Sequence, residues 1–151
     1  MSGAYPVLLV EDDPNDVALT DRAFKKASVT HPLQVVTDGE QAVDYLSGKG
    51  SFADRALHPL PALLLLDLKL PRRSGFEVLE WVRSQPGLKR LPVVVLTSST
   101  ESRDVNRAYD MGANSYLVKP VAFDSLHEMV QGLGLYWLVL NKGPELSHER
   151  D

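Results

Sequence analysis

Short apolar runs alternate along the chain with longer stretches in which apolar residues recur every three or four positions. Runs of four or five mostly apolar residues have the length of strands buried within a parallel sheet. The predicted strands are 7–10, 33–37, the four leucines within 62–71, 93–96 and 115–118. The four consecutive leucines form the most apolar of these runs, so we expect them to form the central strand.

A stretch with helical spacing follows each predicted strand. The predicted helices are 14–27, 40–46, a segment from Gly75 to the break at Pro86-Gly87, 101–111 and 123–141. Pro14 suits a first helical turn, Asp38 an N-cap and Gly112 a C-terminal cap. This alternation predicts a parallel α/β sheet with right-handed crossovers and helices on both faces.

The length of 151 residues suits one domain with a core of its own. We expect this domain to occupy 1–141 and the polar residues 142–151 to fray. We expect no output domain, because the last ten residues are too few to form one. The segment 47–61, rich in Gly, Ser and Pro, is a long connection for an α/β domain.

Polar side chains follow four of the five predicted strands. Glu11 and Asp12 follow the first, Asp67 the third, Thr97 the fourth and Lys119 the fifth. The carboxyl ends of parallel strands lie along one edge of the sheet, which is where α/β sheets bind their ligands. We therefore expect these five side chains to converge although they are far apart in sequence.

Three converging carboxylates repel one another and need a cation. Oxygen ligands without His or Cys favour a hard ion, so the set predicts Mg²⁺, with Mn²⁺ as the alternative. Lys119 and the Thr97 hydroxyl would offer positive charge and a hydrogen bond to a phosphoryl group. A carboxylate can itself be the nucleophile and form an aspartyl phosphate, and Asp67 on the central strand is the candidate.

Each of these residues also has a purely structural explanation. An Asp after a strand is commonly an N-cap or a turn residue, Thr97 precedes a predicted helix, and a Lys at a strand end is usually solvated. The functional hypothesis depends on convergence, because all of these explanations would have to hold together at one edge of the sheet.

Composition narrows the classes of function. The chain contains no cysteine, which excludes disulfides, thiolate metal sites and thiol nucleophiles. The net charge of −4 disfavours nucleic-acid binding, which needs a basic face. No apolar run approaches the length of a membrane span, and the first residues lack the pattern of a signal peptide, so we expect a cytoplasmic protein.

Four segments together resemble the response-regulator receiver domain of two-component signalling. They are V-L-L-V-E-D-D-P-N-D (7–16), L-L-L-L-D-L-K-L-P-R-R-S-G (63–75), V-V-V-L-T-S-S (93–99) and S-Y-L-V-K-P (115–120). The resemblance covers about residues 6–135. It implies a flavodoxin-like fold with five parallel strands in the order 2-1-3-4-5. It also implies that the protein is a signalling protein and not a metabolic enzyme, and that it accepts a phosphoryl group from a sensor histidine kinase.

The resemblance implies roles for the acidic residues. Asp67 would be the phosphoacceptor. Asp12 would bind Mg²⁺ directly and Glu11 would act through water. The backbone carbonyl of Lys69 would complete the protein ligands of the metal.

It also implies roles on the opposite side of the phosphoryl group. Thr97 would be the hydroxyl that moves toward the phosphoryl group, and Lys119 would pair with it. Tyr116 would turn inward when Thr97 moves. The peptide bond before Pro120 would be cis, an isomer that is accessible because proline follows.

Two features depart from the commonest receivers. The loop 47–61 is longer than usual, and the last predicted helix continues past its expected end. Both features resemble the stand-alone receivers that partner bacterial phytochrome histidine kinases.

The last predicted helix has more apolar residues than one buried stripe requires. By spacing, the stripe that faces the sheet is Leu126, Val130, Leu133 and Trp137. Apolar residues outside such a stripe usually mark a partner surface, unless the loop 47–61 or the amino terminus covers them. We predict a homodimer through strand 115–118 and this helix, with its surface at Leu135, Tyr136, Trp137 and Leu138.

Three alternatives remain at this stage. An aspartate-nucleophile phosphatase of the haloacid dehalogenase type also uses a strand-end Asp and Mg²⁺, but it needs a second acid where this chain has Lys69. A receiver-like interaction domain without phosphorylation would be expected to have lost members of the constellation. A flavodoxin-like nucleotide-binding protein is disfavoured because no glycine-rich loop follows the first strand.

Overall fold

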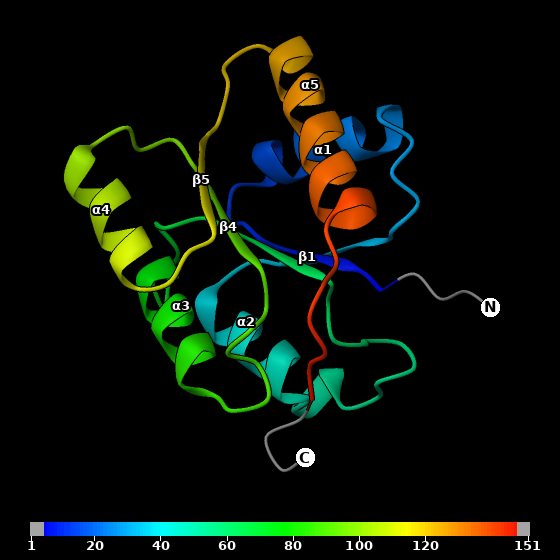
Figure 1. Ribbon diagram of the computed structural model, residues 1–151, viewed down its shortest axis with the longest axis vertical. Helices are drawn as coiled ribbons and strands as arrows, with labels where there is room; N and C mark the ends of the chain where they lie inside the picture. The colour runs from blue at the N-terminus through cyan, green and yellow to red at the C-terminus, as the bar shows by residue number, and fades with distance from the viewer. Residues whose placement is uncertain (1–4, 148–151) are drawn as a thin grey trace.

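The computed structural model describes residues 5–147, which form one parallel sheet with helices on both faces (Figure 1). The strands are β1 (Val7–Val10), β2 (Leu33–Val36), β3 (Leu63–Leu66), β4 (Val93–Thr97) and β5 (Ser115–Val118). The helices are α1 (Pro14–Lys26), α2 (Gly39–Ser47), α3 (Gly75–Ser84), α4 (Ser102–Asp110) and α5 (Phe123–Gly134). A short 3-10 helix, Gly50–Phe52, and a π-helix, Leu135–Leu140, complete the described elements.

All neighbouring strands are parallel, and their order is β2-β1-β3-β4-β5, which confirms the fold that the sequence predicts. The register fixes which residues meet at the carboxyl edge. Val10 pairs with Leu66, so the residues that follow them, Glu11 and Asp67, lie side by side. Thr97 pairs with Val118, which places Lys119 beside Thr97.

The four leucines of β3 lie at the centre of the fold and are almost fully buried. Successive side chains of a strand point to opposite faces, so the leucines alternate between two hydrophobic cores. Burying one leucine completely contributes about 1.5–3 kcal/mol. This run therefore anchors the strand whose next residue is Asp67.

Helices α1 and α5 lie on one side of the sheet and α2, α3 and α4 on the other (Figure 1), and each side has its own core. We call the core on the side of α1 and α5 the α1–α5 core; it includes Leu9, Phe24, Leu63, Leu65, Val94, Leu126 and Val130. We call the core on the side of α2, α3 and α4 the α2–α4 core; it includes Leu8, Ala42, Leu64, Leu66, Val78, Leu79 and Ala108.

The predicted helix 123–141 is not α-helical throughout. It changes to a π-helix over Leu135–Leu140, where the N–H of Asn141 donates to the carbonyl of Tyr136 across 2.7 Å. Trp137 and Leu138 both pack against the α1–α5 core in this segment. Both side chains are half-buried there, so each offers only part of its surface to the predicted dimer contact.

The long connection 47–61 is held in place by Arg55. Its guanidinium donates to the carbonyls of Tyr45 and Leu46 at the end of α2, and to that of His58 within the connection, at distances of 2.7–3.0 Å. The rings of Tyr45, Phe52 and His58 also contact one another. The segment is consequently a packed extension of α2.

The carboxyl-terminal tail lies across the edge of the sheet opposite the carboxyl ends of the strands. Leu146 packs against the α2–α4 core, and the N–H of Ser147 donates to the carbonyl of Gly87 across 2.9 Å. These contacts hold residues 146 and 147 against the domain, where the sequence alone leads us to expect fraying. For 148–151 that expectation lies outside the described residues.

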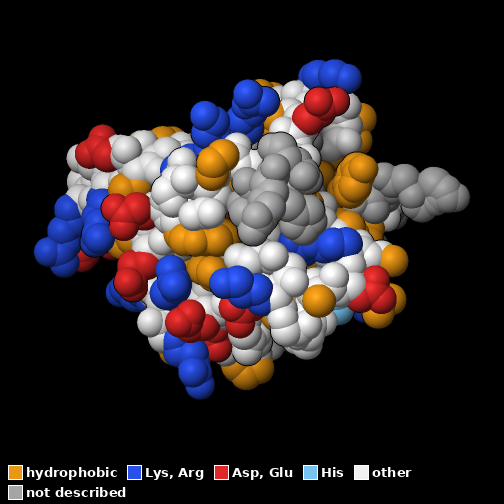
Figure 2. Space-filling model, turned by 90° about the horizontal axis from the view of Figure 1, so that it is seen from below, with side chains coloured by type: hydrophobic (Ala, Val, Ile, Leu, Met, Phe, Trp, Pro, Cys, Tyr) orange, Lys and Arg blue, Asp and Glu red, His pale blue; other side chains and the backbone are white. Residues whose placement is uncertain are grey.

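The face of the molecule seen from below the view of Figure 1 carries charges of both signs. Figure 2 shows Lys and Arg side chains interspersed with Asp and Glu on this side of the molecule. Among residues 5–147, no helix is long and apolar enough to cross a membrane.

Candidate functional site

Asp67 follows β3 directly, and only 8% of its surface is exposed. Its Oδ1 accepts a hydrogen bond from the Thr97 hydroxyl at 2.8 Å and a longer one from the N–H of Lys69 at 3.4 Å. Its Oδ2 accepts from Nζ of Lys119 at 3.0 Å. The structure thus brings three of the predicted site residues into direct contact, from β3, β4 and the end of β5.

Gly75, the first residue of α3, allows the chain to pack closely behind Asp67. A Cβ at position 75 would lie 2.1 Å from the carbonyl oxygen of Asp67 and 2.7 Å from Cα of Leu68. The N–H of Gly75 donates to the carbonyl of Leu68 across 2.9 Å. Only glycine fits at this position, because both neighbours are backbone atoms that cannot turn away.

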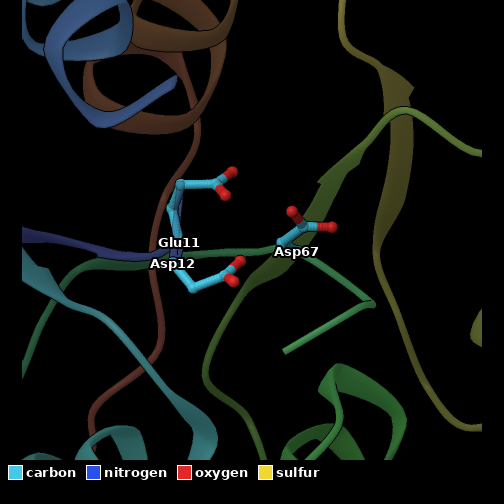
Figure 3. A group of neighbouring side chains, drawn as sticks. All are labelled: Glu11, Asp12 and Asp67. Carbon is cyan, nitrogen blue, oxygen red and sulfur yellow. The ribbon is translucent and has the colours of Figure 1, made fainter. Parts of the chain in front are cut away.

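Glu11, Asp12 and Asp67 form a cluster of three carboxylates at the ends of β1 and β3 (Figure 3). One oxygen from each lies within 4.8 Å of the others. Glu11 and Asp67 are buried and Asp12 is exposed, so the cluster is open on one side. Three oxygen donors with an open side suit a hard divalent cation, which keeps water or phosphate oxygens in its remaining positions.

The ionised form of Glu11 is disfavoured at this site, chiefly because the carboxyl group is buried. Burial raises the pKa of Glu11 to about 7, against hydrogen bonds from Lys119 and from the N–H of Asp13, and the charge of Asp67 raises it further. Desolvation and a like charge both disfavour an ionised carboxylate. A cation among the three carboxylates would reverse this effect.

Lys119 is the cation that the site already contains. Its ammonium donates to Glu11, to Asp16 at 2.9 Å and to Asp67 at 3.0 Å. Burial alone would lower the pKa of Lys119, but the hydrogen bonds to these three carboxylates outweigh burial and raise it. Lys119 is therefore charged throughout the physiological range.

Asp16, on the first turn of α1, contacts Lys119 but was missed by the sequence prediction. An acidic residue in a first helical turn is ordinarily explained by the helix dipole, so its type alone carries no signal. The available signal was its position: Asp16 is the third residue of the helix that follows the acidic pair, close in sequence to Glu11 and Asp12. Asp13, in contrast, is the N-cap of α1 and accepts from the N–H of Asn15 at 2.8 Å.

Tyr116 lies on β5 and is half-buried against the α2–α4 core. Its hydroxyl donates to the carbonyl of Ser99 across 3.0 Å, and Ser99 in turn donates to Asp104 of α4 at 2.6 Å. Burial raises the pKa of Tyr116, so the phenol stays protonated and remains a donor. The ring thus connects β5 to the segment between β4 and α4.

The peptide bond before Pro120 is not cis; residues 5–147 contain no cis peptide bond. The prediction of a cis bond is wrong for this structure. The trans isomer is favoured by about 0.5–1 kcal/mol even before proline. With this isomer the N–H of Lys119 donates to the carbonyl of Thr97 at 2.8 Å, and the side chain still reaches all three carboxylates.

Comparison with known proteins identifies the class. Residues 7–131 match the response regulator receiver domain family, so the chain belongs to that family. It is a phosphoacceptor signalling protein, and the alternatives of a haloacid-dehalogenase-type phosphatase and of a nucleotide-binding protein are rejected.

Particular relatives are similar over nearly the whole chain. The probable methanogenesis regulatory protein FilR2 of Methanothrix harundinacea is 40% identical, over 93% of this chain and 88% of its own. The response regulator Rcp1 of Synechocystis is also 40% identical, over 87% of this chain and 88% of its own.

Two solved structures show the same fold. The phosphorylated cyanobacterial phytochrome response regulator RcpA has a TM-score of 0.87 and 36% identity, and the match covers 95% of this chain and all of RcpA. The Mn²⁺-bound form of Rcp1 has a TM-score of 0.83 and 38% identity, and the match covers 93% of this chain and 99% of Rcp1.

Proposed function

We propose that this receiver takes a phosphoryl group onto Asp67 from a phosphohistidine of a sensor histidine kinase. The observation that carries the proposal is the environment of Asp67, which has a hydroxyl on one oxygen and an ammonium on the other. RcpA, similar over its whole length, is described as phosphorylated.

The transfer balances as a displacement at phosphorus. An oxygen of Asp67 attacks the phosphorus, the P–N bond to the histidine breaks, and its electron pair returns to the imidazole nitrogen. Thr97 and Lys119 already donate to the oxygens of Asp67, so both donors are within reach of the phosphoryl oxygens that arrive there. Pre-positioned donors of this kind stabilise charge in the transition state without reorganisation.

Glu11, Asp12 and Asp67 would hold a divalent cation, together with the backbone carbonyl of Lys69. The donor set and the raised pKa of Glu11 both fit Mg²⁺ or Mn²⁺, and Rcp1 has been solved in an Mn²⁺-bound form. When bound, the cation supplies positive charge to the phosphoryl oxygens.

The kinase is of the phytochrome class in this proposal, because RcpA is described as a phytochrome response regulator. FilR2 and Rcp1 are both 40% identical to this chain, but FilR2 is a probable methanogenesis regulatory protein. The class of kinase therefore needs its own test. Phosphotransfer from a phytochrome kinase, compared with transfer from an unrelated sensor kinase at equal concentration, provides it. Equal rates from both would exclude a phytochrome preference.

We also propose that this phosphotransfer takes place in the cytoplasm.

The response would be a change of surface around β5 and α5. Movement of Thr97 toward the phosphoryl group would open space for Tyr116, whose hydroxyl now contacts Ser99. The apolar side chains available for a second copy of the chain are Leu135, Tyr136, Val139 and Leu140, which are 53–71% exposed. A homodimer through this set and β5 is the proposed assembly.

The decisive experiment is incubation with acetyl phosphate and Mg²⁺, followed by measurement of the intact mass. We expect a gain of one phosphoryl group, which Asp67→Asn abolishes. Asp12→Asn is a useful companion, because it leaves the nucleophile but removes a metal ligand, and labelling should slow strongly. Equal labelling of the parent and Asp67→Asn would overturn the assignment of the phosphoacceptor.

A further inference from the structure

Lys119 has three N–H donors, and three carboxylates use all of them: Glu11, Asp16 and Asp67. A phosphoryl group on Asp67 brings new oxygens to the same ammonium, which must then give up one of its present acceptors. We propose that Asp16 is a positioning residue that competes with the phosphoryl group for Lys119 and so weakens the hold of the site on that group. The proposal rests on Asp67 being the phosphoacceptor.

Asp16 differs from the other two acceptors in its place. Glu11 and Asp67 belong to the three-carboxylate cluster, and their side chains are 3% and 10% exposed. The side chain of Asp16 lies outside that cluster and is 35% exposed. Asp16 is thus the acceptor that water can resolvate at the lowest cost when Lys119 turns to the phosphoryl group.

The carboxylate of Asp16 does not cap helix α1, although its position would allow it to do so. Asp13 is the N-cap, so Asp16 is the third helical residue, which in a capping box would accept from the N–H of the N-cap residue. That N–H donates to Glu11 at 3.1 Å instead. The carboxylate of Asp16 is left to Lys119, which reaches it from the far end of β5.

This ion pair is unlike an ordinary surface pair. On the same helix, Asp21 and Lys25 pair across 3.0 Å with side chains that are 42% and 78% exposed, and such pairs contribute little. Lys119 is only 15% exposed and Asp16 35%, so water screens this pair less than the surface pair, although Asp16 keeps contact with solvent. A charge change at Asp16 should therefore be felt at Asp67, and the same change at Asp21 should not.

Charge determines the expected direction. Phosphorylation makes the group on Asp67 more negative, so its repulsion from the Asp16 carboxylate increases. Asp16→Asn removes that repulsion and frees one N–H of Lys119. A unit charge about 6 Å away, at an effective dielectric constant of about 40–80, changes an anion's affinity by about three- to tenfold.

Beryllofluoride, an anionic analogue of the phosphoryl group, tests this at equilibrium. The parent, Asp16→Asn, Asp16→Glu and Asp21→Asn are titrated with beryllofluoride at saturating Mg²⁺, and bound fluoride is followed by fluorine NMR. We expect Asp16→Asn to bind about three- to tenfold tighter, while Asp16→Glu and Asp21→Asn stay near the parent. Thermal unfolding of all four proteins confirms that each is folded.

The outcomes separate this proposal from the one on which it rests. If the parent binds no beryllofluoride, the assignment of Asp67 fails and the role of Asp16 fails with it. If the parent binds but Asp16→Asn matches it, only the role of Asp16 is wrong. Weaker binding by Asp16→Asn would also overturn the competition, because Asp16 would then be needed to hold Lys119 in place for the anion.

Discussion

The hydroxyl of Thr97 donates a hydrogen bond to Asp67 across 2.8 Å, although thirty residues separate them in the chain. Both residues are buried, and each follows or ends a strand of the same sheet. The contact exists because β3 and β4 are neighbours in which Leu66 pairs with Val95, so Asp67 and Thr97 both lie just past this pair. This hydrogen bond joins Asp67, the proposed phosphoacceptor, to Thr97, whose hydroxyl would move when Asp67 is phosphorylated.

Thr97→Ala should slow phosphorylation by acetyl phosphate without abolishing it, because Lys119 still donates to the other oxygen of Asp67. The substitution also removes a buried hydrogen bond, which should lower the free energy of unfolding by about 1–2 kcal/mol. Intact-mass time courses and urea denaturation measure the two effects. Thr97→Ser keeps the hydroxyl and is the matched control; loss of activity in Thr97→Ser would argue that the methyl group, not the hydroxyl, matters.

Gly75→Ala should destabilise the fold and disturb the site together. The added Cβ would lie 2.1 Å from the carbonyl oxygen of Asp67, and relieving such overlap costs about 1–3 kcal/mol or more. Gly132→Ala is the control, since its Cβ would meet nothing within 4 Å and alanine favours a helix by about 1 kcal/mol. Urea denaturation should show opposite signs for the two variants, and equal stability of Gly75→Ala and the parent would contradict the described packing.

Binding of Mg²⁺ should strengthen as pH rises through about 7. Glu11 is protonated below that pH and ionised above it, and metal ligands must be deprotonated. The ionised fraction of Glu11 rises about tenfold between pH 6 and pH 8, so the affinity should rise by up to about tenfold. Calorimetric titrations at both pH values measure this, and Glu11→Gln should bind more weakly with a flatter pH profile. A flat profile in the parent would exclude Glu11 as the titrating group.

The same group makes the stability of the metal-free protein depend on pH. The pKa of Glu11 is higher in the folded protein than in the unfolded chain, so the folded state binds the proton more tightly. Its contribution is fully present at pH values below about 4.5 and is lost as the pH rises through about 7. Mg²⁺ should therefore raise the melting temperature more at pH 8 than at pH 6, and an equal rise at both would count against this linkage.

The proposed dimer can be tested on its exposed side chains. Tyr136→Ser together with Leu140→Ser should shift the protein toward the monomer, because both residues lie on the exposed side of the π-helix. Leu57→Ser is the control, since Leu57 is equally exposed but lies in the connection 47–61. Light scattering at micromolar concentration, with and without beryllofluoride, decides the point. A parent that is monomeric in both states would refute the dimer.

Much of the fold could be predicted because each strand and helix is indicated by a short segment of the sequence. Four leucines in a row favour a buried strand over a helix, and the alternation of strands and helices then places the polar residues after the strands on one edge of the sheet. Asp67, Thr97 and Lys119 were found in this way, and the structure brings them together. Asp16 was not predicted, because its contact with Lys119 depends on the rotation of α1 about its own axis. The prediction considered only residues that directly follow strands.

Other features depend on packing between distant segments, which short sequence patterns do not encode. The π-helix places Trp137 and Leu138 against the core together, whereas an α-helical spacing assigned Leu138 to the exposed side. The tail looked polar because one leucine among charged and small residues gives no periodic signal. The hydrogen bond from Ser147 to Gly87 depends on a loop sixty residues earlier in the chain, so the sequence of the tail does not indicate it.

The path of the tail has a practical consequence for reporters. Ser147 lies beside Gly87, at the edge of the sheet where the strands begin, whereas Asp67 lies where they end. A fluorescent dye or an immobilisation tag attached at residue 147 would therefore lie on the side away from the phosphorylation edge. The docking kinase and the tether would occupy opposite ends of the domain, so phosphotransfer could be followed on a surface without obstructing the reaction.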